Sequence, residues 1–181
     1  MRKKTFYSLL FVYLVFMGTF TVWFFRKFWE TKGLLEESWY SGSPQEVVMR
    51  YSGLATVPLV ISVFTVMFTR MFTSAGNTLE STDTEFLVVQ KNILQNNLEQ
   101  TFLFLVNYFP VATELSNETL ALVGLLFVSS RLLYYLSYPL GVLVGFQPLR
   151  GPGFILSFGL TVSLLKLNIY KLVEKVNLTT C

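Results

Sequence analysis

The sequence predicts an all-α fold, a polytopic membrane helix bundle with five transmembrane helices. Of its 181 residues, 52% are hydrophobic and only 14% are charged, whereas a soluble domain carries about a quarter charged residues. The mean hydropathy is +0.53, and apolar runs of the length that a bilayer-spanning helix needs recur along the chain. A polar stretch rich in Ser, Thr, Gly and Asp, residues 73–85, separates two of these runs, as expected of a turn between helices.

The residue types that are missing exclude several kinds of chemistry. The chain has no histidine, which excludes imidazole acid–base catalysis and histidine-ligated metal sites. Its single cysteine, Cys181, cannot form an internal disulfide or a cysteine-rich metal cluster. The net charge of +3 is spread along the chain rather than clustered, so we expect no nucleic-acid partner. Any thiol chemistry must therefore come from a bound molecule.

The first expected helix lies at the N-terminus. A basic start, Arg2–Lys4, precedes the mostly apolar run Phe6–Phe25, which has the length of a spanning helix. An apolar core of this length without a small-residue cleavage site favours a retained signal anchor, residues 1–29, over a cleaved signal peptide. Residues 30–53 are polar and acidic, and we expect them to form a loop.

Four further spans form a membrane domain of residues 54–173, which a tail of residues 174–181 follows. These spans are Leu54–Phe72, Phe86–Pro110, Leu120–Tyr138 and Phe154–Leu172. Short turns are expected at Ala112–Glu118 and Gly145–Gly153, and Thr84 or Asp83 is expected to cap the helix that begins near Phe86.

Charge next to the spans predicts the topology. With the basic N-terminus in the cytosol, five spans place the C-terminus on the lumenal or extracellular side. The sequons at Asn117 and Asn177 then lie on that side too. Whether either asparagine carries a glycan stays open.

Polar side chains gather in the first half of the span Phe86–Pro110. Asn92, Gln95, Asn96 and Glu99 recur at intervals of three and four residues, so on a helix they share one side. A carboxylate inside a bilayer is costly, and such a group usually faces the bundle interior. The pattern therefore indicates a binding site or a buried ion pair.

A guanidinium and two phenols share one face of the next span. Arg131, Tyr134 and Tyr138 fall at i, i+3 and i+7. Because arginine stays charged even in lipid, it needs an anion or a cluster of carbonyl groups beside it. We expect Glu99 to be that partner.

Two interpretations of these groups remain open. In the first, Glu99 and Arg131 only tie two helices together, and the tyrosine hydroxyls and Asn96 satisfy the remaining hydrogen bonds. In the second, they form an anion-binding pocket that opens to the cytosol, with three cations at its rim. The candidate binding residues are Arg70, Lys91, Asn92, Gln95, Asn96, Glu99, Arg131, Tyr134, Tyr138 and Arg150, of which Arg70, Lys91 and Arg150 are the rim cations.

Three motifs follow one another in this chain: Asn96-Asn97-Leu98-Glu99, then Arg131-Leu132-Leu133-Tyr134 with Tyr138, then Arg150-Gly151-Pro152-Gly153-Phe154. This pattern resembles the MAPEG family of membrane proteins, which act in eicosanoid and glutathione metabolism. The resemblance implies that the spans from Leu54 to Leu172 form the four family helices and that Met1–Trp29 is an extra helix in front. Within the family, the likeness is greatest to the mattrin-like members, which have five spans.

The resemblance also implies a ligand and an assembly. MAPEG enzymes are homotrimers that bind glutathione between neighbouring subunits near the cytosolic face. Carried over residue by residue, the contacts would come from Asn96, Glu99, Tyr134, Tyr138, Arg70 and Arg150. Arg150 and Tyr138 are the catalytic candidates, since a cation and a hydroxyl donor stabilise a thiolate.

The chain departs from the MAPEG enzymes in its cations. Asn92 stands where those enzymes carry an arginine, with only Lys91 adjacent. Lysine cannot form the two parallel hydrogen bonds that an arginine guanidinium forms with a carboxylate. The arginine that usually follows the last tyrosine is absent, and Arg150 lies at a different spacing.

These departures favour a non-enzymatic, mattrin-like protein. As the resemblance implies, it would act in membrane trafficking or membrane-receptor turnover, with a receptor as its client, in the Golgi, the lysosome or the plasma membrane. The alternative is a glutathione-dependent transferase or peroxidase that acts on lipophilic substrates. A channel or transporter is the third class that we consider.

Overall fold

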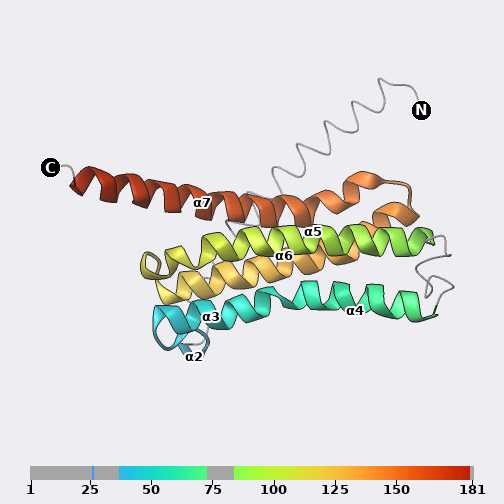
Figure 1. The fold of residues 1–181 in the computed structure, drawn as a ribbon, viewed down its shortest axis with the longest axis horizontal. Coiled ribbons are helices and arrows are strands. Elements are labelled where there is room, and N and C mark those ends of the chain that lie inside the picture. The colour runs from blue at the N-terminus through green and yellow to red at the C-terminus, as the bar shows by residue number, and fades with distance from the viewer. Residues whose placement is uncertain (1–25, 27–36, 73–83, 180–181) are drawn as a thin grey trace, which may run out of the picture.

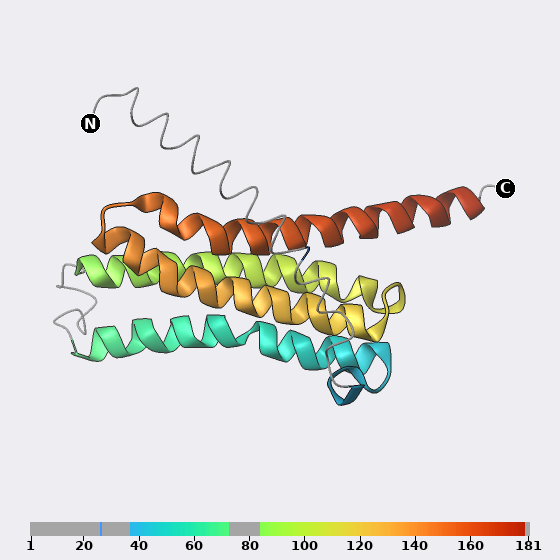
Figure 2. The same ribbon diagram turned by 180° about the vertical axis from the view of Figure 1, so that it is seen from behind.

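The protein forms a bundle of long helices. The computed structural model describes residues 26, 37–72 and 84–179, and within them every regular element is helical. The helices are α2 (Glu37–Tyr40), α3 (Pro44–Ala55), α4 (Val57–Phe72), α5 (Glu85–Tyr108), α6 (Asn117–Leu143) and α7 (Gly151–Thr179), with short 3-10 turns η2 (Pro110–Thr113) and η3 (Gln147–Arg150). Figures 1 and 2 show α4 to α7 side by side, with the end of α7 extending past the bundle. The predicted all-α class is confirmed.

Three of the described helical segments are long and apolar enough to cross a membrane: Pro44–Phe72, Asn117–Leu143 and Pro148–Leu178. Helix α5 has the length of a span but not the required hydropathy. Polar residues on both sides of the helix account for this difference: Asn97, Gln100 and Asn107 are buried, and Asn92, Gln95 and Glu99 are exposed. The expected first span, Phe6–Phe25, lies outside the described residues.

The predicted loop of residues 30–53 is wrong over its second half, where the chain is already helical. Helix α2 and most of α3 lie within these residues. Ser43 caps α3 in a capping box with Glu46: the Ser43 side chain accepts a hydrogen bond from the Glu46 backbone, and the Glu46 carboxylate accepts one from the Ser43 backbone. Pro44 occupies the first helical turn, where a missing N–H costs nothing.

Helices α5 and α6 begin within three residues of the expected positions, but α6 ends five residues and α7 seven residues later than expected. The expected tail of residues 174–181 is therefore helical as far as Thr179. Thr84 caps α5, where its hydroxyl accepts a hydrogen bond from the Leu87 backbone at 3.3 Å. Ser116 caps α6 in the same way through Thr119. The expected turn at Ala112–Glu118 is shorter than predicted, because η2 and the cap of α6 occupy most of it.

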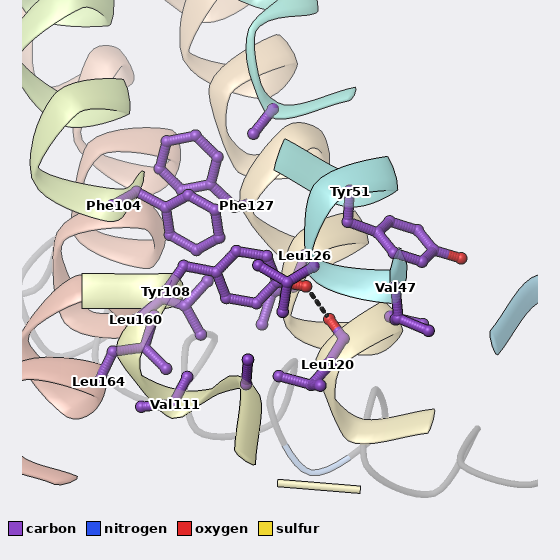
Figure 3. Packing of buried hydrophobic residues seen from close by; sticks show 14 residues of the cluster. Val47, Tyr51, Phe104, Tyr108, Val111, Leu120, Leu126, Phe127, Leu160 and Leu164 are labelled. Carbon is purple, nitrogen blue, oxygen red and sulfur yellow. Dashed lines mark hydrogen bonds between the residues drawn. The ribbon is translucent and has the colours of Figure 1, made fainter. Parts of the chain in front are cut away.

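A core of stacked aromatic rings packs the η2 end of the bundle. The rings of Phe104 and Phe127 stack with centroids 3.9 Å apart, which joins α5 to α6. The Tyr108 hydroxyl donates to the Leu120 carbonyl at 2.6 Å (Figure 3), so this buried phenol has its polar atom satisfied. Val47 and Tyr51 bring α3 into the same cluster.

At the opposite end, α7 approaches α6 without a side chain between them. A Cβ atom built on Gly153 would lie 2.6 Å from the Ser130 carbonyl oxygen and would also clash with the Tyr134 backbone nitrogen. Only glycine permits this distance between two backbones. The approach fixes the first turns of α7 against α6.

A buried cation joins three helices between these two ends. The Arg131 side chain on α6 is fully buried. Its Nε donates to Asn97 Oδ1 at 2.9 Å, and its Nη2 donates to the same oxygen and to Asn96 Oδ1, the latter at 2.7 Å. Its Nη1 donates to Ser157 Oγ on α7 at 3.1 Å.

The expected ion pair between Glu99 and Arg131 is therefore wrong. On α5, Glu99 is exposed, whereas Asn97 is fully buried and faces the other helices. The Glu99 carboxylate instead accepts a hydrogen bond from Gln95 on its own helix, at 2.6 Å. Neutral oxygens avoid the second desolvation cost that a buried carboxylate would add. The Asn97 amide group completes the arrangement by donating to Ser62 and to the Pro58 carbonyl on α4.

We predict that Gly153→Ala destabilises the protein by about 1–3 kcal/mol, the usual cost of overpacking. The matched control is Gly159→Ala on the same helix, since a Cβ at Gly159 meets nothing within 4 Å. That change should be neutral or slightly stabilising. Thermal unfolding in detergent measures both variants, and equal effects would contradict the close approach.

We also predict that Asn97→Leu lowers the free energy of unfolding by about 2–3 kcal/mol, because hydrogen bonds to a charged group are the strong ones and the guanidinium stays buried. Glu99→Gln is the control, and it should change stability by less than about 0.5 kcal/mol, as exposed substitutions do. Chemical denaturation in detergent compares them. A larger loss in Glu99→Gln than in Asn97→Leu would mean that the carboxylate is the true partner of Arg131.

Candidate functional site

A polar pocket of about 460 Å³ opens where α5, α6 and α7 meet, at the end of the bundle that carries η3. The first half of α5, the last half of α6 and the start of α7 supply its walls. The lining residues are Asn92, Gln95, Asn96, Glu99, Tyr134, Tyr138, Arg150, Gly151 and Phe154.

The wall formed by α6 and η3 holds two phenols and a guanidinium. The rings of Tyr134 and Tyr138 meet edge to face, with centroids 5.5 Å apart. The Arg150 guanidinium lies 5.3 Å from the centre of the Tyr138 ring, and its Nη1 donates to the Tyr138 hydroxyl at 3.3 Å. A cation over a phenol ring is attracted to its face, so this pair positions the two side chains together.

The wall formed by α5 is lined with amides. Helical spacing places Asn92, Gln95, Asn96 and Glu99 along it, as the sequence predicted. The Gln95 amide donates to the Glu99 carboxylate at 2.6 Å. This wall therefore presents hydrogen-bond donors and acceptors together with one negative charge.

Arg131 lies behind the pocket rather than in its lining. Its guanidinium carbon is 4.5 Å from the centre of the Tyr134 ring, and its Nη2 donates to Asn96, so it holds two of the lining side chains in place. The Tyr134 hydroxyl makes no hydrogen bond to any described residue. The contact between its ring and Arg131 therefore orients Tyr134, and its hydroxyl can form a hydrogen bond with a ligand.

The structure brings seven of the ten predicted site residues into this pocket: Asn92, Gln95, Asn96, Glu99, Tyr134, Tyr138 and Arg150. Arg131 supports the pocket from behind, and Arg70 and Lys91 do not line it. Arg70 lies in the last turn of α4, and Lys91 lies on α5 outside the row of amides.

Sequence reasoning missed residues that depend on the rotation of a helix or on a close approach. Asn97 and Ser157 hold Arg131, and Gly151 and Phe154 complete the pocket. The signal that the sequence offered for Asn97 was an amide off the row, since Asn97 is two positions from Glu99 and so faces nearly the opposite way.

This pocket can form hydrogen bonds with a ligand, and the charges of its lining residues balance. Its lining holds one cation, Arg150, and one anion, Glu99. Among the described residues, no cluster of three or more potential metal-ligating carboxylate or thiol groups exists. The phenol and guanidinium of Tyr138 and Arg150 are the groups able to stabilise developing negative charge.

The chain matches the model of a known protein family. The model of the MAPEG family matches residues 48–170, more than half of the chain. This match begins in α3 and ends in α7, so it covers the whole pocket and the Arg131 contacts.

No curated protein and no solved structure gives a significant match. The family match covers the helices, the pocket and the buried cation together, and it agrees with the three apolar helical segments that could span a bilayer. The chain therefore belongs to the MAPEG family of multi-pass integral membrane proteins.

Proposed function

We propose that this protein is a non-enzymatic, mattrin-like member of the MAPEG family. It would serve membrane trafficking or membrane-receptor turnover in the secretory or endolysosomal system, with a membrane receptor as its client. The contacts of Arg131 are the observation that supports a non-enzymatic function. This buried cation at the centre of the family scaffold donates its hydrogen bonds to side chains of the protein itself.

The contacts of Arg131 support a structural role. Four hydrogen bonds join its guanidinium to side chains of α5 and α7, and its charge lies over the Tyr134 ring. A guanidinium has five N–H donors, so little of its capacity is left for a ligand. Arg131 therefore links α6 to α5 and α7.

The charge of the pocket supports the same conclusion. Glutathione carries a net negative charge at neutral pH, so a site that holds it tightly benefits from surplus cations. Here Arg150 is balanced by Glu99, and neither Arg70 nor Lys91 lines the pocket. The amide of Asn92 occupies the position where the resemblance places an arginine in the family enzymes.

A glutathione-dependent transferase or peroxidase that acts on lipophilic substrates is the second candidate, and one contact favours it. Arg150 donates to the Tyr138 hydroxyl at 3.3 Å, and a phenol polarised by a cation can donate to a thiolate and favour its charged form. Tyr134, whose hydroxyl makes no hydrogen bond within the described part of the chain, belongs to the same wall. In this function, glutathione would occupy the pocket within a homotrimer, and substrates would enter from the bilayer.

We predict that the purified protein in detergent does not accelerate conjugation of a chlorinated aromatic electrophile to glutathione. The rate should equal that of a heat-denatured sample, because the pocket has no surplus positive charge to hold the thiolate. Spectrophotometric detection of the thioether product measures this rate.

Two variants decide between the candidates if activity is found. Tyr138→Phe removes the phenol hydroxyl but keeps the ring, and Arg150→Ala removes the cation. A rate that either variant abolishes would establish the transferase and overturn our proposal. Calorimetry with glutathione at millimolar concentration is the companion measurement: an absence of binding removes the second candidate.

A further inference from the structure

The pocket between α5, α6 and α7 holds two opposite charges that do not contact each other. Arg150 lies in η3 and Glu99 lies on α5, and these two described side chains form no ion pair with one another. Arg150 donates to the Tyr138 hydroxyl instead, and Glu99 accepts from Gln95. Each wall of the pocket therefore offers one charge to a ligand.

The wall formed by α6 and η3 suits a phosphate. The Arg150 guanidinium has five N–H donors, of which the contact with Tyr138 uses one. The Tyr134 hydroxyl, which has no hydrogen-bond partner within the described part of the chain, is a further donor on this wall. Charge-assisted hydrogen bonds from a guanidinium are typical of phosphate sites.

The wall formed by α5 suits a primary ammonium. Glu99 supplies a carboxylate, and Asn92 supplies an amide oxygen that accepts no hydrogen bond from a described residue. A primary ammonium has three N–H donors and no acceptor, so these oxygens match it. A quaternary ammonium has no N–H donor and is usually held by aromatic rings, of which the described residues of α5 contribute none to the pocket lining.

The position of the pocket relates it to the membrane. The segment Pro148–Leu178 is long and apolar enough to cross a bilayer, and Arg150 lies at its beginning. The ends of spanning segments lie at the level of the lipid headgroups. A headgroup can therefore reach Arg150 from the surrounding bilayer.

An apolar path leads from the pocket to the surface of α7. The ring of Phe154, which lines the pocket, stacks on the ring of Phe158 with centroids 5.7 Å apart. Phe158 is 45% exposed. Acyl chains of a lipid whose headgroup occupies the pocket can lie along these two rings.

We propose that the pocket binds a phospholipid whose headgroup joins a phosphate to a primary ammonium, as in phosphatidylethanolamine. Arg150 and the Tyr134 hydroxyl donate to the phosphate, and Glu99 and Asn92 accept from the ammonium. Such a headgroup is neutral overall, as is the pocket lining, and about 460 Å³ is a volume typical of small-molecule sites. The inference rests on the proposed function, because it places a lipid rather than glutathione in this pocket.

Native mass spectrometry of the delipidated protein in detergent tests the proposal. The protein is titrated with three lipids that have the same acyl chains: phosphatidylethanolamine, phosphatidylcholine and phosphatidylglycerol. Phosphatidylcholine keeps the positive charge but has no N–H donor, and phosphatidylglycerol has no positive charge. We expect phosphatidylethanolamine to bind about ten times more tightly than either, the factor that one hydrogen bond to a charged group supplies.

Variants show whether the pocket causes this preference. Glu99→Gln should abolish the preference for phosphatidylethanolamine over phosphatidylcholine, and Arg150→Gln should weaken the binding of all three lipids. Glu85→Gln is the matched control, because Glu85 is also an exposed carboxylate on α5 but does not line the pocket. Equal binding of the three lipids, or a preference that Glu99→Gln retains, would overturn the proposal.

Soluble phosphoethanolamine distinguishes a lipid from a free ligand. A large excess should leave the bound lipid in place, because the acyl chains add contacts that the soluble compound lacks. Displacement at equal concentration would overturn the lipid as the ligand. The outcome is separable from the proposed function: a missing lipid preference without glutathione conjugation overturns only this inference, whereas conjugation by the purified protein overturns the proposed function.

Discussion

The structure depends on one constraint, the need to bury a permanent positive charge among helices in a membrane protein. Arg131 meets this need with side-chain oxygens of Asn96, Asn97 and Ser157 rather than with a carboxylate. Neutral oxygens satisfy the donors at a lower desolvation cost than a second buried charge would bring. Because these oxygens come from two other helices, the same bonds fix how α5, α6 and α7 lie relative to one another.

The pocket is a consequence of that arrangement. Arg131 orients Asn96 and the Tyr134 ring from behind, while the close approach at Gly153 holds the start of α7 against α6, next to the wall that contains Arg150. The cation at the centre of the scaffold therefore shapes the pocket without lending it an open charge. Because Arg131 has a structural role and the charges that line the pocket balance, we favour a non-enzymatic function over transferase chemistry.

Much of the fold and most of the pocket could be predicted from the sequence. Helical periodicity placed Asn92, Gln95, Asn96 and Glu99 on one wall, and this wall exists because a helix carries residues three and four apart on one side. The partner of Arg131 could not be predicted in this way. Choosing Asn97 over Glu99 requires the rotation of α5 relative to α6, which tertiary packing sets.

The helical start of α3 and the role of Gly153 were missed for related reasons. The capping box of Ser43 and Glu46 is a local signal that the polar composition of residues 30–53 obscured. The requirement for glycine at position 153 arises from the α6 backbone, more than fifteen residues away in sequence. Arg70 was assigned to the site by its charge and by the family resemblance, and it lies outside the pocket lining.

A double-mutant cycle between Arg131 and Asn97 tests the central claim most directly. The free energy of unfolding is measured for Arg131→Met, for Asn97→Leu and for the double variant. If the buried charge depends on the amide, the double variant loses less stability than the two single variants together, with a coupling of about 1–3 kcal/mol. Additive losses would contradict the account, because they would mean that the guanidinium does not rely on the Asn97 oxygen.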